Sequence, residues 1–377
     1  MTWGNPETAT EKLLCTCLRP VSFVWGLCSY ARLRAYGCGW LKQHRLPRPV
    51  VSVGNLTCGG TGKTPVTIDL AKRLIKAGKK VAILSRGYRR KSREELVIAS
   101  DGEGHLASSP DCGDEPYMMA RAVPQAVVLV GANRAVSGAV AVSVYNADII
   151  LLDDGFQHLG TDRDQDIVLI DYNDDPGNDS LMPAGRLREP LSALTRADWV
   201  VITKIPRNPD RGQLRYLQEL ICERAPRAQL TTCRFAPERL RPFGSDKVSL
   251  SPDSLSGVKV MALSAIARPQ TFHELLSELG ALIVCQRAFP DHHWYTRQDL
   301  ELVKADLRSS GAEIIVTTEK DCARLDPELI AGLPVSALEL KTEWVGKIPA
   351  LDDLLHSNRE DKSAAPGQDT KVAVSLQ

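Results

Sequence analysis

Short apolar runs alternate with helical patterns along most of the chain after Arg48. The apolar runs are "PVVSVGN", "KVAILSR", "QAVVLVG", "ADIILLDD", "DIVLID" and "DWVVITK", and helical patterns occur at 65–77, 115–122, 134–145 and 214–224. Because the runs are apolar along their whole length, they are typical of strands that are covered on both faces. The alternation predicts an α/β fold with a parallel sheet and crossover helices.

A second α/β cycle begins after Pro206. The runs "VKVMALSAI", "ALIVCQRAF" and "AEIIVTTEK" predict strands, and 296–309 predicts a helix. We expect "LTTCRFAPERL" and "VSALELKTEW" to pair as a two-stranded link between two domains. The expected parts are an N-terminal region at 1–46, a larger domain at 47–230, the linker at 231–240 and 335–344, a smaller α/β domain at 241–334, and a polar, disordered tail at 355–377.

The N-terminal region contains one membrane signal. The stretch "PVSFVWGLCSYA" is apolar and is flanked by arginines, but its twelve residues are too few for a spanning helix, which needs about 20. Apolar positions around it recur at helical spacing, at Leu14, Leu18, Val21, Trp25 and Cys28. Two interpretations stay open at this point: a helix that lies in the interface of an anionic membrane, or a helix packed on its own domain.

The composition of the 377 residues is globular, with 43% hydrophobic and 25% charged residues. The net charge is only +1, which argues against a nucleic-acid binder that works through bulk charge. The ten cysteines form no C-x-x-C motif and no regular framework. We therefore expect reduced thiols in a cytosolic protein rather than disulfides or a zinc site.

The segment "TCGGTGKT", residues 57–64, lies between a predicted strand and a predicted helix. It follows the phosphate-binding signature G-x-x-x-x-G-K-[ST], except that Thr57 stands where the first glycine is usual. Backbone amides and the helix N-terminus would hold phosphate oxygens, Lys63 would add a charge, and Thr64 would bind Mg²⁺. The residues predicted to bind the nucleotide here are Thr57, Gly59, Gly60, Thr61, Gly62, Lys63 and Thr64.

A phosphate-binding loop predicts a second feature, an apolar strand that ends in an acid near the magnesium. The run "ADIILLDD" ends in Asp153 and Asp154, at the edge of a parallel sheet where ligands bind. With Thr64 these aspartates form the predicted Mg²⁺ site. We expect ATP rather than GTP, because "VVITKIP" has Pro206 where guanine-specific relatives of the fold place an aspartate.

Three further stretches are hard to explain as scaffold. "CGDEPYMMARAV" places Asp114 at the start of a helix, "DDGFQH" contains Gln157, and "FPDHHWYT" places His292 and His293 in a loop of the smaller domain. Acids are also common helix caps, and paired histidines are also common on surfaces or bind metals. Alternatively, an acid of one domain and a histidine of the other form a base and its orienting partner across a cleft.

These motifs resemble those of one family, tetraacyldisaccharide 4′-kinase, the inner-membrane enzyme that phosphorylates the lipid A precursor. The resemblance rests on "VSVGNLTCGGTGKTP", "LSRGY", "GDEP", "GANR", "LLDDGFQH", "MPAGRLREP", "FPDHHWYT" and "TTEKDCARL", which occur in family order over residues 12 to 345. The family's loop likewise has threonine in place of the first glycine. The residues alone give no role for Thr318, Glu319 and Lys320 of the last motif.

The resemblance implies a phosphate-loop kinase fold of two α/β/α domains that close around ATP and substrate. It implies that Asp114 acts on a sugar hydroxyl with the help of a histidine, which is His292, with His293 as the alternative. Arg134 matches a family arginine suited to the charge on the transferring phosphoryl group. The implied reaction moves the γ-phosphate of ATP to the 4′-hydroxyl of the tetraacyldisaccharide 1-phosphate.

The resemblance also assigns the nucleotide-binding residues. It places Lys63 on the β- and γ-phosphates, Gln157 beside the phosphates, and Mg²⁺ between Thr64 and the aspartates at 153 and 154. The implied acceptor carries acyl chains, so the resemblance favours the membrane interpretation of the N-terminal region. It implies a peripheral protein on the cytoplasmic face of the inner membrane, and we expect a monomer.

The rival hypothesis is a phosphate-loop switch or metallochaperone without a lipid substrate. Such a protein would want a base-reading aspartate after "VVITK" and a metal-gathering cluster of cysteines and histidines. The sequence has neither feature. The lipid kinase is therefore the prediction that the sequence favours.

Overall fold

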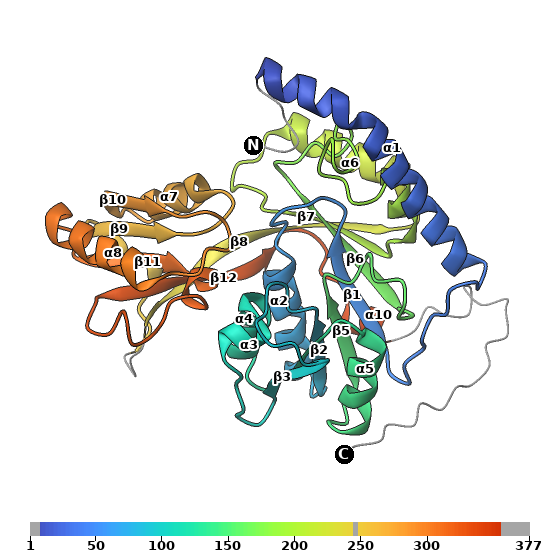
Figure 1. Ribbon diagram of the computed structural model, residues 1–377, viewed down its shortest axis with the longest axis horizontal. Coiled ribbons are helices and arrows are strands. Elements are labelled where there is room, and N and C mark those ends of the chain that lie inside the picture. The colour runs from blue at the N-terminus through green and yellow to red at the C-terminus, as the bar shows by residue number, and fades with distance from the viewer. Residues whose placement is uncertain (1–7, 244–247, 356–377) are drawn as a thin grey trace.

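The computed structural model describes residues 8–243 and 248–355 of the chain (Figure 1). Within these residues the strands form one twelve-stranded sheet, in the order β10-β9-β11-β12-β8-β7-β6-β1-β5-β2-β4-β3. The strands are β1 (Val50–Asn55), β2 (Val81–Ser85), β3 (Leu96–Asp101), β4 (Val127–Gly131), β5 (Ile149–Asp153), β6 (Gln165–Asp171), β7 (Trp199–Thr203), β8 (Gln229–Pro242), β9 (Lys259–Ser264), β10 (Leu282–Ala288), β11 (Ile314–Thr318) and β12 (Val335–Trp344). The α-helices are α1 (Ala9–Gly37), α2 (Lys63–Lys76), α3 (Ser109–Cys112), α4 (Asp114–Ala122), α5 (Arg134–Ser143), α6 (Arg211–Arg224), α7 (Pro269–Glu278), α8 (Arg297–Ser310), α9 (Glu319–Cys322) and α10 (Leu351–Leu355).

The predicted α/β fold is confirmed, because the sheet is mostly parallel and helices cover its faces (Figure 1). Every residue of β1 is buried. Its side chains alternate between two cores: Val51 and Val53 pack with residues of α2 and α4, whereas Val50 packs with a residue of α5. The continuous apolar runs of the sequence follow from this coverage.

Several short elements were not predicted from the sequence, among them β3 and α7. β3 pairs antiparallel with β4 at the edge of the sheet, with a shift of register between Ile98 and Ser100. Its burial alternates irregularly, so the strand lacks the continuous apolar run of its neighbours. α7 has only ten residues and begins at Pro269, which left little periodicity to detect.

The sheet passes from one half of the molecule to the other through two long strands. β8 pairs in parallel with β7 and antiparallel with β12, and β12 pairs in parallel with β11. β9 and β11 share a separate core with α8, which contains Met261, Leu300 and Ile315. We call residues 8–230 the larger half and the described residues of 241–334 the smaller half. The β8–β12 pair lies where the linker was expected, and the domain boundaries stay a prediction.

The N-terminal helix is longer than the apolar run in the sequence. α1 has 29 residues and continues through Pro20. Its segment Leu13–Gly37 is long and apolar enough to cross a membrane by length and composition alone, and 6% of the apolar window is buried. The expectation of a segment too short to span does not hold for this helix, because it counted only the uninterrupted apolar run.

α1 also packs along the outside of the larger half (Figure 1). Ser22 Oγ accepts a hydrogen bond from the amide of Ala184 at 2.9 Å, and Trp25 Nε1 donates to the carbonyl of Arg188 at 3.0 Å. Other side chains of α1 face outward, and Phe23 is 74% exposed. The helix is therefore docked and at the same time presents apolar side chains to the surroundings. The tail expected at 355–377 lies outside the described residues, apart from Leu355.

Candidate active site

The loop of residues 57–64 joins β1 to α2, as the sequence predicted. Gly62 has a positive φ of 89°, and a Cβ at this position would lie 2.3 Å from a ring carbon of Phe235 on β8. Glycine is therefore required both by conformation and by space. α2 begins at Lys63, so its N-terminal amides and the positive end of the helix dipole face the loop, an arrangement that binds phosphate.

Thr57 has a structural reason to replace the usual glycine. Its hydroxyl donates to Asp174 Oδ2 at 3.2 Å, and both side chains are buried. The far end of the loop is also held, because Thr203 Oγ1 donates to the carbonyl of Thr61 at 2.8 Å. Asn55 donates from Nδ2 to the carbonyl of Thr57 at 2.7 Å. The loop is thus fixed in shape by its own neighbours.

The acidic pair at the end of β5 lies next to the loop. Asp154 is paired with Lys63 at 3.5 Å and with Arg188 at 2.9 Å. Burial alone would raise the pKa of Asp154, but these two cations lower it below its ordinary value. Lys63 Nζ also donates to Asn55 Oδ1 at 3.2 Å. The lysine is therefore already positioned at the mouth of the loop.

Asp153 is buried and incompletely paired. Its Oδ2 accepts a hydrogen bond from Ser85 Oγ at 3.2 Å, while Oδ1 has no hydrogen-bond partner. Burial, together with the charges of Glu115 and Asp154, raises its pKa to about 7. A buried, unpaired carboxylate oxygen beside a second carboxylate and the buried Thr64 fits a hard divalent cation.

The acids, histidines and cysteines near this position do not make a complete set of metal ligands by themselves. Within residues 8–243 and 248–355, no group of three or more His, Cys, Asp or Glu side chains is placed to hold a metal ion. Mg²⁺ usually keeps waters and binds one or two carboxylates together with substrate phosphates. The set of two aspartates and a threonine is compatible with that preference.

Arg134 and Gln157 lie in the same region. Arg134 is buried at the start of α5 and donates to the carbonyl of Gly131 at 2.8 Å. Burial lowers its pKa to about 10, against the opposing effect of Asp153. Gln157 donates to the carbonyl of Asn55 at 2.8 Å. Both predicted residues therefore lie near the loop or the acidic pair.

Arg188 is a site residue that the sequence analysis missed. It binds Asp154 through Nη1, and the same atom lies 3.4 Å from Gln157 Oε1. Its motif, "MPAGRLREP", was noted for the resemblance, but nothing in the sequence linked it to the acidic strand. The sequence signal that could have identified Arg188 was a basic residue within a motif that is highly specific for the family.

Asp114 and His292 meet between the two halves. Asp114 is the first residue of α4, and His292 Nδ1 lies 3.1 Å from Asp114 Oδ2. Burial alone would raise the pKa of Asp114, but the hydrogen bond with His292 and the charges of Arg324 and Lys320 hold it far below its ordinary value. Asp114 is thus an ionised carboxylate at neutral pH.

His293 points to a different neighbourhood. Its Nε2 lies 2.9 Å from Asp299 Oδ2, and its ring stacks on Phe289 with centroids 4.9 Å apart. Asp299 also forms the capping box of α8 with Thr296. Of the two adjacent histidines, the one that contacts Asp114 is His292.

Two further cations from the smaller half reach this pair, and the sequence analysis missed both. Arg324 has a fully buried side chain and donates to Asp114 from Nε at 2.8 Å and again from Nη2. Lys320 Nζ lies 3.1 Å from His292 Nε2. Both belong to "TTEKDCARL", so the specificity of that motif was the available signal. We call Asp114, His292, Lys320 and Arg324 the inner cluster.

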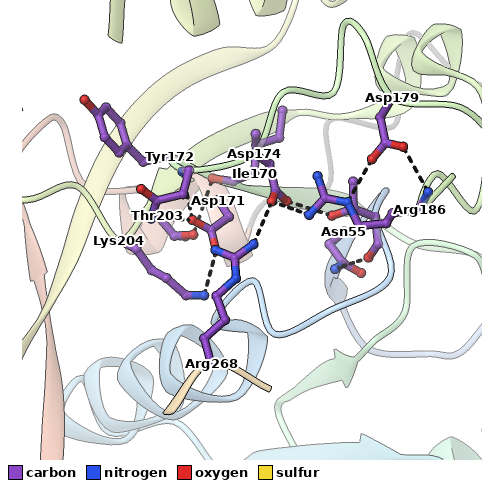
Figure 2. Close-up of polar contacts among 12 residues, drawn as sticks. Asn55, Ile170, Asp171, Tyr172, Asp174, Asp179, Arg186, Thr203, Lys204 and Arg268 are labelled. Atoms are coloured by element: carbon purple, nitrogen blue, oxygen red, sulfur yellow. Dashed lines mark hydrogen bonds and ion pairs between the residues drawn. The ribbon is translucent and has the colours of Figure 1, made fainter. Parts of the chain in front are cut away.

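A second group of ion pairs also joins the halves (Figure 2). Arg268, just before α7, reaches from the smaller half to Asp171 at 3.6 Å and to Asp174 at 3.4 Å. The two aspartates are also paired within the larger half, Asp171 with Lys204 at 2.6 Å and Asp174 with Arg186 at 2.6 Å. We call these five residues the outer cluster. Asp174 connects it to Thr57 and hence to the loop.

Over most of its length the chain is similar to known proteins of one family. The family model described as tetraacyldisaccharide-1-P 4′-kinase matches residues 14–358. A tetraacyldisaccharide 4′-kinase of Anaeromyxobacter sp. strain Fw109-5 is 39% identical over 91% of each chain, and one of Geobacter sulfurreducens is 36% identical over 93% of this chain and 97% of its own. The crystal structure of LpxK from Aquifex aeolicus in complex with ATP has a TM-score of 0.72 at 32% identity, and the match covers 91% of this chain and 98% of that one.

These relatives do not favour the alternative of a nucleotide-dependent switch or metallochaperone. The family match covers most of the chain, including both halves and the β8–β12 pair that joins them. The chain therefore belongs to the tetraacyldisaccharide-1-P 4′-kinase family, and it is a kinase.

Proposed function

We propose that the chain transfers the γ-phosphoryl group of ATP to the 4′-hydroxyl of the tetraacyldisaccharide 1-phosphate precursor of lipid A. The observation that carries the proposal is the contact between Asp114 of the larger half and His292 of the smaller half. An ionised acid between the halves supports the proposal, and its neighbour Glu115 is close enough to the acidic strand end to help raise the pKa of Asp153. Phosphoryl transfer needs little covalent help from the protein, so alignment and charge stabilisation account for most of the catalysis.

ATP would bind in the loop of residues 57–64, and the Aquifex protein has been crystallised in complex with ATP. The loop amides and the start of α2 would hold the phosphate oxygens, and Lys63 would lie against the β- and γ-phosphates. Lys63 is paired with Asp154 and Asn55, which hold it beside the loop. Gln157 and Arg188 would line the same side of the phosphates.

Mg²⁺ would be held by Thr64, Asp153 and Asp154. The unpaired Oδ1 of buried Asp153 supports this set. When bound, the ion would neutralise negative charge on the phosphate oxygens. Because the pKa of Asp153 is raised to about 7, a protonated carboxyl at lower pH is a poor ligand. The apparent affinity for Mg²⁺ should therefore rise with pH through about 7, and Asp153→Asn should abolish that rise.

Asp114 would accept the proton of the attacking hydroxyl, and His292 would orient it. The low pKa of Asp114 keeps it ionised, although such a carboxylate is a weak base. A weak base suffices when the transition state is loose, because the attacking hydroxyl has formed little of its new bond and its proton is not yet strongly acidic. Arg134 would face the charge that develops on the phosphoryl oxygens.

The acylated substrate requires work at a membrane surface, and α1 supports that requirement. Exposed apolar side chains such as Phe23 would enter the interface of the cytoplasmic leaflet. Between α1 and the phosphate loop lies a cavity of about 290 Å³, lined by Trp25, Arg32, Cys58, Met182 and Arg188, among others. Its apolar walls with two arginines suit an amphiphile, so we place part of the lipid here. The protein would act as a peripheral monomer.

The test is Mg-ATP-dependent phosphorylation of the tetraacyldisaccharide 1-phosphate in detergent micelles. Lys63→Ala and Asp114→Ala should each lower kcat/KM by about 100-fold or more, because each removes a group used in the transition state. Arg215→Ala, an exposed change on α6, should retain the activity of the unaltered protein. ATP hydrolysis without any labelling of the disaccharide would refute the acceptor and bring back the nucleotide-dependent switch.

A further inference from the structure

Lys320 makes a contact that the assignment of Asp114 and His292 does not explain. Its ammonium nitrogen lies 3.1 Å from His292 Nε2 and 3.4 Å from Glu115 Oε1. The backbone here is fixed, because α9 follows β11 directly and Thr318 caps its start by accepting from the amide of Asp321. Lys320 therefore approaches the histidine on the side opposite to Asp114.

The contact determines where the imidazole carries its proton. An ammonium group only donates hydrogen bonds, so His292 Nε2 must offer its lone pair to Lys320. In a neutral ring the proton then lies on Nδ1, the atom 3.1 Å from Asp114 Oδ2. The opposite tautomer would set an N–H against the ammonium and a lone pair against the carboxylate, and both contacts would be repulsive. Arg324 Nη2 also lies 3.2 Å from His292 Nδ1, but it donates to Asp114 Oδ2, so the carboxylate accepts from both Arg324 and the ring.

The backbone of His292 indicates that the ring orientation is imposed. His292 has φ 63°, in the left-handed region that non-glycine residues seldom adopt. Such strain persists only where the surroundings fix the residue, and it is found disproportionately at functional sites. The ring also meets Tyr88 edge-on, with centroids 5.7 Å apart. Lys320 thus acts on a histidine whose place is already restricted.

We propose that Lys320 is a positioning residue, which fixes the His292 tautomer whose Nδ1–H is donated to Asp114. The proposal rests on the proposed function, in which Asp114 accepts the proton of the sugar hydroxyl. With Lys320 in place, Asp114 Oδ2 is held by donors from His292 and Arg324. Without it, the charged group left on the Nε2 side is Asp291, whose Oδ2 lies 3.9 Å from Nε2 and favours a proton on that nitrogen. The lone pair then turned to Asp114 would repel the carboxylate. The polar contacts of Lys320 described above are with His292 and Glu115.

The direct test is nuclear magnetic resonance of the full-length protein with ¹⁵N-labelled histidine. The chain has seven histidines, so the signals of His292 are assigned by their loss in His292→Gln. In the unaltered protein we expect the ¹⁵N shifts of a neutral ring protonated on Nδ1. Lys320→Met should move them toward the Nε2–H tautomer or a mixture. Lys320→Arg keeps a donor and should retain the original pattern.

A matched control separates the two contacts of Lys320. Glu115→Gln weakens the pair with Glu115 but leaves the contact with His292, so it should keep the Nδ1–H pattern. An unchanged pattern in Lys320→Met would overturn the proposal, and so would a change of the same size in Glu115→Gln. If Lys320→Met unfolds, Lys320→Gln, which keeps a neutral amide, is compared with Lys320→Arg in its place.

Kinetics supply the second readout. Lys320→Met should lower kcat for the disaccharide by about 10- to 100-fold, because orientation of the base is lost, and should leave the KM for ATP within about twofold. Lys304 pairs with Glu301 on the outside of α8, so Lys304→Met should leave both the kcat and the KM for ATP unchanged. A rise in KM for ATP at constant kcat would contradict the proposal. Full activity of Asp114→Asn would instead refute the base assignment, whatever the tautomer of His292 proves to be.

Discussion

The inner and outer clusters join the same two halves with the same kinds of ion pair, but in opposite environments. The side chain of Arg324 in the inner cluster is 0% exposed, whereas that of Arg268 in the outer cluster is 45% exposed. A buried charge that loses its partner is left in a poorly solvating interior, while an exposed one is taken up by water. Burial, rather than the number of ion pairs, should decide how strongly each cluster holds the halves together.

The clusters also contact different parts of the site. The inner cluster contains Asp114 and His292, which we assign to the acceptor hydroxyl. The outer cluster leads through Asp174 to Thr57 at the start of the phosphate loop. The smaller half therefore contacts the larger half both at the residues assigned to the acceptor and at residues that hold the phosphate loop. The strong connection is on the acceptor side.

Breaking the inner cluster should have the largest effect. Arg324→Met is expected to lower the free energy of unfolding by about 3–5 kcal/mol, because it leaves Asp114 and Asp321 as buried charges without their cation. Urea unfolding followed by circular dichroism measures the loss. Arg308→Met, an exposed change in the last turn of α8, should change it by no more than about 0.5 kcal/mol. A loss below about 1 kcal/mol for Arg324→Met would remove the contrast.

Acid should test the inner cluster without changing Arg324. The pKa of Asp114 is lowered below its ordinary value of 3.8, since His292, Arg324 and Lys320 outweigh the effect of burial. A carboxyl of this kind adds stability that is present above 3.8 and is lost as pH falls below it. The difference in unfolding free energy between the unaltered protein and Asp114→Asn should therefore be constant from about pH 7 to 5 and shrink only below the ordinary pKa. A difference that already shrinks near neutral pH would show that the carboxylate is not held by these cations.

Breaking the outer cluster should cost little stability. Arg268→Ala is expected to lower the free energy of unfolding by less than about 1 kcal/mol, because Asp171 and Asp174 keep Lys204 and Arg186. It should raise the KM for ATP by up to about fivefold, since Asp174 positions the loop through Thr57. Arg215→Ala serves as the control. A large loss of stability would mean that exposure does not distinguish the two clusters.

The smallest expected effect is a coupling between the clusters. Ala265 donates its amide to Asp321 Oδ1 at 3.0 Å and accepts from Arg324 Nη1 at 2.9 Å, and Arg268 follows three residues later. Because one short segment contacts both clusters, Arg324→Met and Arg268→Ala should be non-additive by about 0.5 kcal/mol or more. A double-mutant cycle of urea unfolding measures this term. Strict additivity would show that the segment transmits nothing.

Local patterns in the sequence were sufficient for the fold and for part of the site. The continuous apolar runs predicted buried parallel strands, and "TCGGTGKT" with "ADIILLDD" predicted a loop and acids that lie side by side in the structure. These features are local because each strand brings its own C-terminal residues to the same edge of the sheet. The resemblance to a family supplied Asp114 and His292, which local patterns left ambiguous.

The cations of the two clusters could not be predicted in the same way. Arg324 meets Asp114 across 210 positions of sequence, and Arg268 meets Asp174 across 94. No periodicity relates residues so far apart; only the packing of the two halves brings them together. The length of α1 was missed for another reason, because its polar residues interrupt the apolar run without ending the helix.

The segment after β9 has a consequence for which changes of chain length the protein can accept. Surface loops usually tolerate insertions and deletions, since closing a slightly longer loop costs little entropy. Residues 265–268 are different, because the amide and carbonyl of Ala265 are anchored at one end and the guanidinium of Arg268 at the other. With one residue more or fewer, Ala265 and Arg268 could not both keep their contacts. We therefore expect natural variation in this segment to take the form of substitutions at constant length.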